Sequence, residues 1–245
     1  MLLSFARAET LRTLRNRRYL IFVVAFPVLL YLINANIYGS QADGTGVGYN
    51  VVLMVSMAAY GALASSMMSS AVPLAAERQS GWLRQIQITP LPPWAVVAAK
   101  LASAMTLVLP SLLLVGLVAV VQQGVSLPPG RWLALLLALW LGVVPFVALG
   151  LALGSLLSAD ACQPATMICM FALTIAGGLW FPPDLFGGVM RTVAEITPSF
   201  HYASLGWSLA GGHGVAMLDV LVVAAWAVVL GGAAALLYRR ATVRA

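Results

Sequence analysis

Charged residues are scarce in this chain. Of its 245 residues, 8% are Asp, Glu, Lys or Arg and 62% are hydrophobic. A soluble domain carries about 25% charged residues, which it needs on its surface. The hydrophobic residues here come in runs of roughly 18 or more, long enough to cross a bilayer. The composition therefore excludes an ordinary soluble domain and predicts an integral membrane protein.

Cysteine and histidine occur twice each. Cys162 and Cys169 have no His or acidic cluster nearby, so we interpret them as small buried apolar side chains and not as metal ligands or a disulfide. His201 and His213 lack the spacing of a metal site, and we interpret them as interfacial polar residues. No serine has the setting of a catalytic nucleophile. The sequence thus gives no indication of an enzyme active site.

Lysine occurs once, which excludes a nucleotide site. A P-loop requires G-x-x-x-x-G-K-[ST], whereas Lys100 follows Val-Val-Ala-Ala. Acidic residues are also sparse in the hydrophobic runs. Only Asp219 falls inside a run, near the outer end of the last one, residues 215–238. Pumps driven by protons or sodium usually carry ionisable groups there, so secondary transport is disfavoured. We expect Lys100 to reach the cytoplasmic lipid headgroups. Uphill transport would need energy from another polypeptide.

Six hydrophobic runs predict an all-α integral membrane protein with one transmembrane domain, residues 1–245. We expect an amphipathic interface helix over residues 1–18, a short cytoplasmic helix over 77–90 and short extracytoplasmic helices over 181–213. Residues 158–163 are expected to form a tight turn. The six predicted spans are residues 19–38, 49–76, 94–121, 131–157, 164–180 and 215–238.

The basic residues are distributed unevenly. Eleven of the 13 Lys and Arg residues lie in the amino-terminal segment, in residues 77–100 or in the carboxyl-terminal tail, and only Arg131 and Arg191 lie on the other side. By the positive-inside rule both termini are cytoplasmic, which requires an even number of spans. We expect a multi-pass protein of the plasma membrane. Topology and membrane lipids explain the net charge of +6, so no nucleic acid partner is expected.

A polar segment, residues 77–93, separates the second and third predicted spans. Read as a helix, it gathers the apolar side chains of Trp82, Leu83 and Ile86 on one side. Such a helix can dock into a groove of a partner protein or lie among lipid headgroups, and the periodicity alone does not distinguish the two.

This segment carries a family resemblance. Its sequence, E-R-Q-S-G-W-L-R-Q-I followed by T-P-L-P-P, resembles the first cytoplasmic loop of type-2 ATP-binding-cassette (ABC) export permeases, which reads E-R-x-x-G-x-L-x-x-L-x-x-T-P. Residues 181–202 resemble the short outer helices of the same family, and the likeness covers nearly the whole chain. Trp82 stands where the family often has Thr, and Ile86 where Leu is common. Both changes keep an apolar face.

The resemblance implies a coupling helix that docks onto a separate ATPase subunit. It also implies a second permease subunit, identical or closely related, with the passage between the two. ATP and Mg would be bound by the ATPase, and this chain would hold no cofactor. Glu77, Arg78 and Gly81 would frame the coupling helix, and Trp82, Leu83 and Ile86 would be its apolar anchors.

Substrate contacts are expected on the second and fifth spans, because Met and aromatic side chains adapt to varied apolar surfaces. Tight helix packing is the alternative at each position. The lack of charge in the spans suggests a hydrophobic or amphiphilic cargo such as a drug, natural product or lipid-like molecule, as in multidrug efflux. An ATP-independent channel, a passive carrier and a membrane scaffold are the alternatives. The expected contact residues are Ser56, Met57, Tyr60, Ser66, Met67, Phe171 and Thr174.

Overall fold

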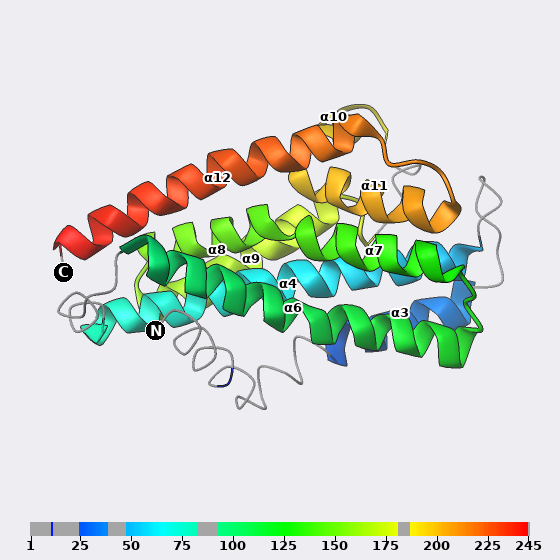
Figure 1. The fold of residues 1–245 in the computed structure, drawn as a ribbon, viewed down its shortest axis with the longest axis horizontal. Helices are drawn as coiled ribbons and strands as arrows, with labels where there is room; N and C mark the ends of the chain where they lie inside the picture. The colour runs from blue at the N-terminus through cyan, green and yellow to red at the C-terminus, as the bar shows by residue number, and fades with distance from the viewer. Residues whose placement is uncertain (1–10, 12–24, 39–47, 83–92, 181–186, 245) are drawn as a thin grey trace.

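The computed structural model describes Leu11 and residues 25–38, 48–82, 93–180 and 187–244 (Figure 1). The predicted interface helix, apart from Leu11, and most of the predicted coupling helix, including Leu83 and Ile86, lie outside these residues. The regular elements of the described residues are all helices. They are α3 (Phe26–Tyr38), α4 (Tyr49–Gln79), α6 (Pro93–Gln123), α7 (Pro129–Leu141), α8 (Val144–Leu156), α9 (Ala159–Ala176), α10 (Gly188–Ile196), α11 (Pro198–Gly211) and α12 (Met217–Arg244).

Five helical stretches are long and apolar enough to cross a membrane: α4, α6, α7 with α8, α9 and α12. The all-α, multi-pass prediction is therefore confirmed. The shorter apolar helix α3 lies within the first predicted span, of which residues 19–24 are not described. The first predicted span, and with it the count of six, therefore stays a prediction.

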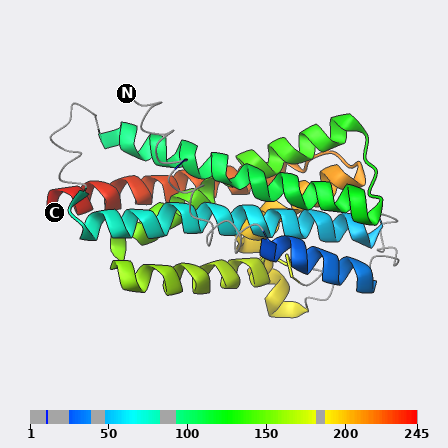
Figure 2. The ribbon, with the colours of Figure 1, turned by 90° about the horizontal axis from the view of Figure 1, so that it is seen from below.

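Helix α4 is the centre of the bundle. It packs against α3, α6, α8, α9 and α11, and 83% of its apolar span segment is buried, compared with 11% for α12. Figure 2 shows α4 in cyan with α3 and α9 along one of its sides. Small residues on α4 allow this dense packing, because helix backbones approach closely in lipid only where side chains are small.

Helix α8 contacts α4 through a G-x-x-x-G pattern, Gly150 and Gly154. A Cβ atom at Gly150 would lie 2.8 Å from the carbonyl oxygen of Met67, and one at Gly154 would lie 2.5 Å from that of Ala71. Both distances are too short for a carbon atom. The two backbones therefore touch, and this contact fixes α8 against the central helix.

Gly150→Ala is expected to destabilise the bundle by about 1–3 kcal/mol, because the added methyl group overpacks the contact between α4 and α8. Denaturation by SDS in mixed micelles, followed by tryptophan fluorescence, measures the change. Gly231→Ala is the matched control, since a Cβ at that position of α12 meets nothing within 4 Å. Equal stability of the two variants would contradict the close contact.

Three predicted boundaries differ from the structure. The fourth span is divided at Gly142 and Val143, because Pro145 has no N–H to donate and its ring clashes with the carbonyl four residues earlier. Helix α9 begins at Ala159, so most of the predicted turn over residues 158–163 is helical, with Pro164 inside the helix near its start. Helix α4 runs to Gln79, beyond the predicted end at residue 76.

Helix α9 also ends early, at Ala176 instead of residue 180. Gly178 has a φ of 74°, and the N–H of Leu179 donates to the carbonyl of Thr174. This is the hydrogen bond of a Schellman motif, which terminates a helix at a left-handed glycine. Trp180 consequently lies beyond the helix and turns back toward α4.

The two short helices α10 and α11 lie at the end of the bundle opposite to the carboxyl terminus (Figure 1). Helix α11 packs against α4, α7 and α12, and the hydroxyl of its buried Tyr202 donates to the carbonyl of Leu139 at 2.8 Å. The sequence pattern fits both a surface helix and a partly inserted one. In the structure α11 is inserted between other helices.

Candidate functional site at the end of helix α4

A buried ion pair joins α4 to α6. The ammonium nitrogen of Lys100 lies 2.6 Å from Oε2 of Glu77, and the two side chains are 4% and 3% exposed. The expectation that Lys100 reaches the lipid headgroups is wrong, because its side chain ends on this carboxylate. Two charges can be buried only when each compensates the other. The pair therefore fixes the last turns of α4 to the first turns of α6.

Arg78 links α4 to the end of α8. Its Nη1 donates to the carbonyl oxygens of Gly154 and Leu157 at 3.0 and 3.2 Å. The last carbonyls of a helix have no partner within the helix, and an arginine at this end satisfies them and complements the negative end of the helix dipole. Residues adjacent in sequence, Glu77 and Arg78, thus attach the same end of α4 to two different spans.

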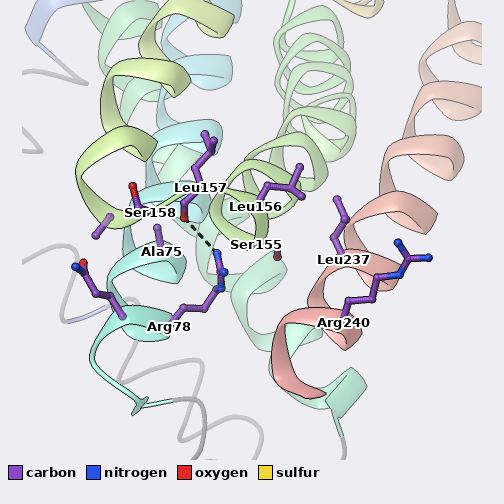
Figure 3. A pocket seen from close by; sticks show the side chains of 10 residues that line it. Ala75, Arg78, Ser155, Leu156, Leu157, Ser158, Leu237 and Arg240 are labelled. Atoms are coloured by element: carbon purple, nitrogen blue, oxygen red, sulfur yellow. Dashed lines mark hydrogen bonds between the residues drawn. The ribbon is translucent and has the colours of Figure 1, made fainter. Parts of the chain in front are cut away.

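A cavity of about 520 Å³ opens beside Arg78 (Figure 3). Figure 3 shows Arg78 turned toward the connection between α8 and α9, with Arg240 on the α12 side. The cavity lies between the ends of α4, α8 and α12 and the start of α9. Its lining residues are Ala75, Arg78, Gln79, Ser155, Leu156, Leu157, Ser158, Ala159, Leu237 and Arg240.

Gly81 lies just beyond the end of α4. Its φ is 73°, and its N–H donates to the carbonyl of Arg78, so it follows the helix cap at Ser80 in the left-handed conformation that favours glycine. Trp82 comes next and is 43% exposed. The structure therefore brings Glu77, Arg78, Gly81 and Trp82 to the base of α4. The first two belong to the spanning helix itself and not to a separate helix.

Two of the expected substrate contacts, Tyr60 and Phe171, meet in an aromatic cluster. Both rings contact Trp180, with centroids 5.4 and 5.8 Å from it, and Phe26 of α3 lies 6.1 Å from Tyr60. The indole N–H of Trp180 is buried and has no hydrogen-bond partner among the described residues. The sequence prediction missed Phe26 and Trp180. For Trp180 a usable signal existed, since it is an aromatic residue with a polar group at the end of the fifth predicted span.

The other five expected contacts lie outside this aromatic cluster and are buried within the chain. Met57 and Met67 are buried in the core. Ser66 and Thr174 donate to carbonyls of their own helices, at Leu63 and Met170, and Ser56 accepts from the indole N–H of Trp207. These five positions fit the alternative of tight helix packing, and so does Tyr60, which is 2% exposed, so the substrate contacts stay a prediction.

The helix bundle, its spans and the joined base of α4 define a multi-pass membrane protein. Residues 2–207 match the family model described as ABC-2 type transporter, and the chain belongs to this family of transporter permeases. The chain is also 24% identical over 219 residues, 89% of either chain, to the Bacillus subtilis (strain 168) protein named "Putative transport permease YvfS". The resemblance carried by residues 77–93 is thereby confirmed at the level of the family.

Proposed function

We propose that this chain is the transmembrane subunit of an ATP-driven exporter in the plasma membrane, powered by a separate ATPase subunit. Membership of the ABC-2 type transporter family supports a transport role. The observation that carries the proposal is the double attachment at the base of α4, through Glu77 to Lys100 and through Arg78 to Gly154 and Leu157. Glu77 and Arg78 are the first two residues of the predicted coupling helix, residues 77–90.

The attachment provides a route for mechanical work. A force applied to the loop after Gly81 reaches α4 directly, and it reaches α6 and α8 through the ion pair and the arginine. The three spans would therefore shift together as a rigid body, which is one of the ordinary forms of a conformational switch. ATP and Mg would act on the ATPase, whose closure would move the coupling segment with Trp82, Leu83 and Ile86 as anchors.

The aromatic cluster of Phe26, Tyr60, Phe171 and Trp180 is the best candidate for contact with cargo. It lies where α3, α4 and α9 meet, and both α3 and α9 have exposed apolar residues, such as Ile33 at 56% and Ile168 at 71%. A second permease subunit, identical or closely related, would cover this face and enclose the passage. Aromatic rings bind apolar molecules of varied shape, which favours a hydrophobic or amphiphilic cargo.

Replacing Trp82 and Ile86 with Glu tests the coupling segment. We expect copurification with the coexpressed ATPase subunit to fall about 10-fold or more, because buried aromatic anchors dominate interface energies and a carboxylate there would be desolvated. Val189→Glu is the control, since Val189 is an equally apolar residue on α10, 81% exposed and far from the base of α4.

The same preparations separate the alternatives. A complex that forms and hydrolyses ATP unchanged in the Trp82 and Ile86 variants would show that the segment does not dock. Flux of a lipophilic dye through liposomes that contain the permease without its ATPase would instead indicate a channel or passive carrier. If the intact complex showed no ATP-dependent flux of any cargo tried, the remaining alternative would be that the chain is a membrane scaffold.

A further inference from the structure

His201 and Asp219 form a buried pair at the end of the bundle opposite to the carboxyl terminus. Nδ1 of His201 lies 2.6 Å from Oδ1 of Asp219, and both side chains are less than 10% exposed. The other ring nitrogen, Nε2, lies 2.7 Å from the carbonyl oxygen of Glu195, and the hydroxyl of Ser204 donates to Oδ2 of Asp219 at 2.7 Å. The interpretation of His201 as an interfacial residue is therefore wrong.

The hydrogen bonds fix the number of protons in this cluster, which comprises His201, Ser204, Asp219 and the Glu195 carbonyl. A carbonyl oxygen can only accept, so Nε2 must carry a hydrogen. A bare ring nitrogen and a carboxylate are both acceptors and would repel each other, so the 2.6 Å contact requires a proton between them. Whether nitrogen or oxygen carries that proton, the pair has no net charge.

The shared proton joins three elements. Glu195 is near the end of α10, His201 and Ser204 belong to α11, and Asp219 is in the first turn of α12. A further contact, from the indole N–H of Trp226 to the carbonyl of Ile196 at 3.3 Å, also connects α12 to the end of α10. Apart from these contacts, α12 packs mainly against α8, and only 11% of its span segment is buried.

Other charges face this region from several elements. Arg191 and Glu195 on α10 pair with each other at 3.0 Å and are exposed, and His213 lies exposed in the connection after α11. Arg131 of α7 approaches Gly212 at the end of α11. The remaining charged residues on elements packed against α11 are Glu77 and Arg78 of α4, Asp160 of α9 and Arg239, Arg240 and Arg244 of α12.

We propose that the cluster is a proton-binding site in which one proton, held between His201 and Asp219, fastens α12 to α10 and α11. Loss of the proton leaves the imidazole with one N–H for two acceptors, the Asp219 carboxylate and the Glu195 carbonyl, so one of the two contacts loses its hydrogen bond and the pair gains a net negative charge in a buried place. The junction then loosens. Rising pH on this side of the membrane therefore releases the end of α12, which makes the junction a pH-sensitive latch. This inference does not depend on the coupling segment or on the cargo.

Nitrogen-15 histidine spectroscopy of the full chain in lipid tests the proton count directly. The chain has two histidines, so the His213→Asn variant shows His201 alone. We expect an N–H at Nε2 and a strongly deshielded proton bound to or shared with Nδ1 at neutral pH. The shared proton should be absent in Asp219→Asn. An Nδ1 without any proton contact in the otherwise wild-type protein would overturn the proposal.

Hydrogen exchange then tests the latch. We expect amides of residues 195–204 and 217–222 to exchange about 10-fold or more faster, after correction for intrinsic rates, once the shared proton is lost with rising pH. His201→Gln should show the faster exchange at all pH values, and His213→Asn should behave as the wild type. Loss of the proton signal without a change in protection would show that the pair is a static element of packing, and the proposal would be rejected.

Discussion

Lys100→Met is expected to destabilise the helix bundle by about 3–5 kcal/mol. The substitution removes the ammonium group that lies 2.6 Å from Oε2 of Glu77 and leaves a carboxylate that is 3% exposed. Removing one member of a buried ion pair costs this much, because the remaining charge cannot regain its hydration without opening the structure. Chemical denaturation of the purified chain in mixed micelles measures the loss.

The double variant Glu77→Gln with Lys100→Met is the critical control. Replacement of both charges by neutral groups of similar volume is often close to neutral for stability, so most of the loss should be regained. Lys100→Arg keeps the charge and should fall between the wild type and Lys100→Met. If Lys100→Met alone were as stable as the wild type, the ion pair could not be the attachment between α4 and α6.

The same pair of variants separates stability from transport. If the ion pair transmits movement from the coupling segment, the double variant should fold well and still transport poorly. Regained stability with full ATP-dependent transport would assign the pair to folding alone. In that case the hydrogen bonds of Arg78 to the end of α8 would be the remaining candidate for passing movement from the base of α4 to another span.

The fold was largely predictable because lipid imposes simple rules. Long hydrophobic runs gave α4, α6 and α12 within a few residues at most ends, since backbone groups in a bilayer must be satisfied inside each helix. The errors occurred at proline and glycine. Pro145 divides a span, Pro164 does not begin one, and Gly178 ends α9 early, because their effect depends on the exact register of the surrounding hydrogen bonds.

The candidate site was predictable only in part. The motif located Glu77, Arg78, Gly81 and Trp82, but it did not reveal that Lys100 compensates Glu77, since 22 residues, the segment 83–92 among them, separate the two in sequence. Local periodicity carries no information about such pairs. The same limit explains His201, whose partner Asp219 is 18 positions away.

The aromatic cluster shows the opposite case. Tyr60, Phe171, Met57 and Met67 were all chosen for their chemical type. Tyr60 and Phe171 proved to be neighbours around Trp180, whereas Met57 and Met67, which are buried in the core as Tyr60 is, do not belong to this cluster. Residue type predicts what a side chain can bind. Only the packing of α3, α4 and α9 decides which of these side chains gather around one ring.

Arg78→Ala is expected to reduce ATP-dependent transport about 10-fold or more while the complex continues to hydrolyse ATP. The carbonyls of Gly154 and Leu157 would lose their donor, and the end of α8 would be held to α4 by packing alone and would follow its movement less closely. Because the docking residue Trp82 is untouched, assembly with the ATPase should persist. The measurement is transport and hydrolysis in the same proteoliposomes, expressed as cargo moved per ATP consumed.

Arg78→Lys is the matched variant. Lysine keeps the positive charge beside the cavity but lacks the planar guanidinium that reaches both carbonyls, so it should recover only part of the transport. Gln79→Ala, one residue further along α4 on the same cavity, should leave cargo moved per ATP unchanged. If Arg78→Ala lowered hydrolysis and transport in equal proportion, Arg78 would serve assembly with the ATPase. The loss of transport with hydrolysis preserved is what identifies a link inside the membrane subunit, because such a link passes on movement that the ATPase has already produced.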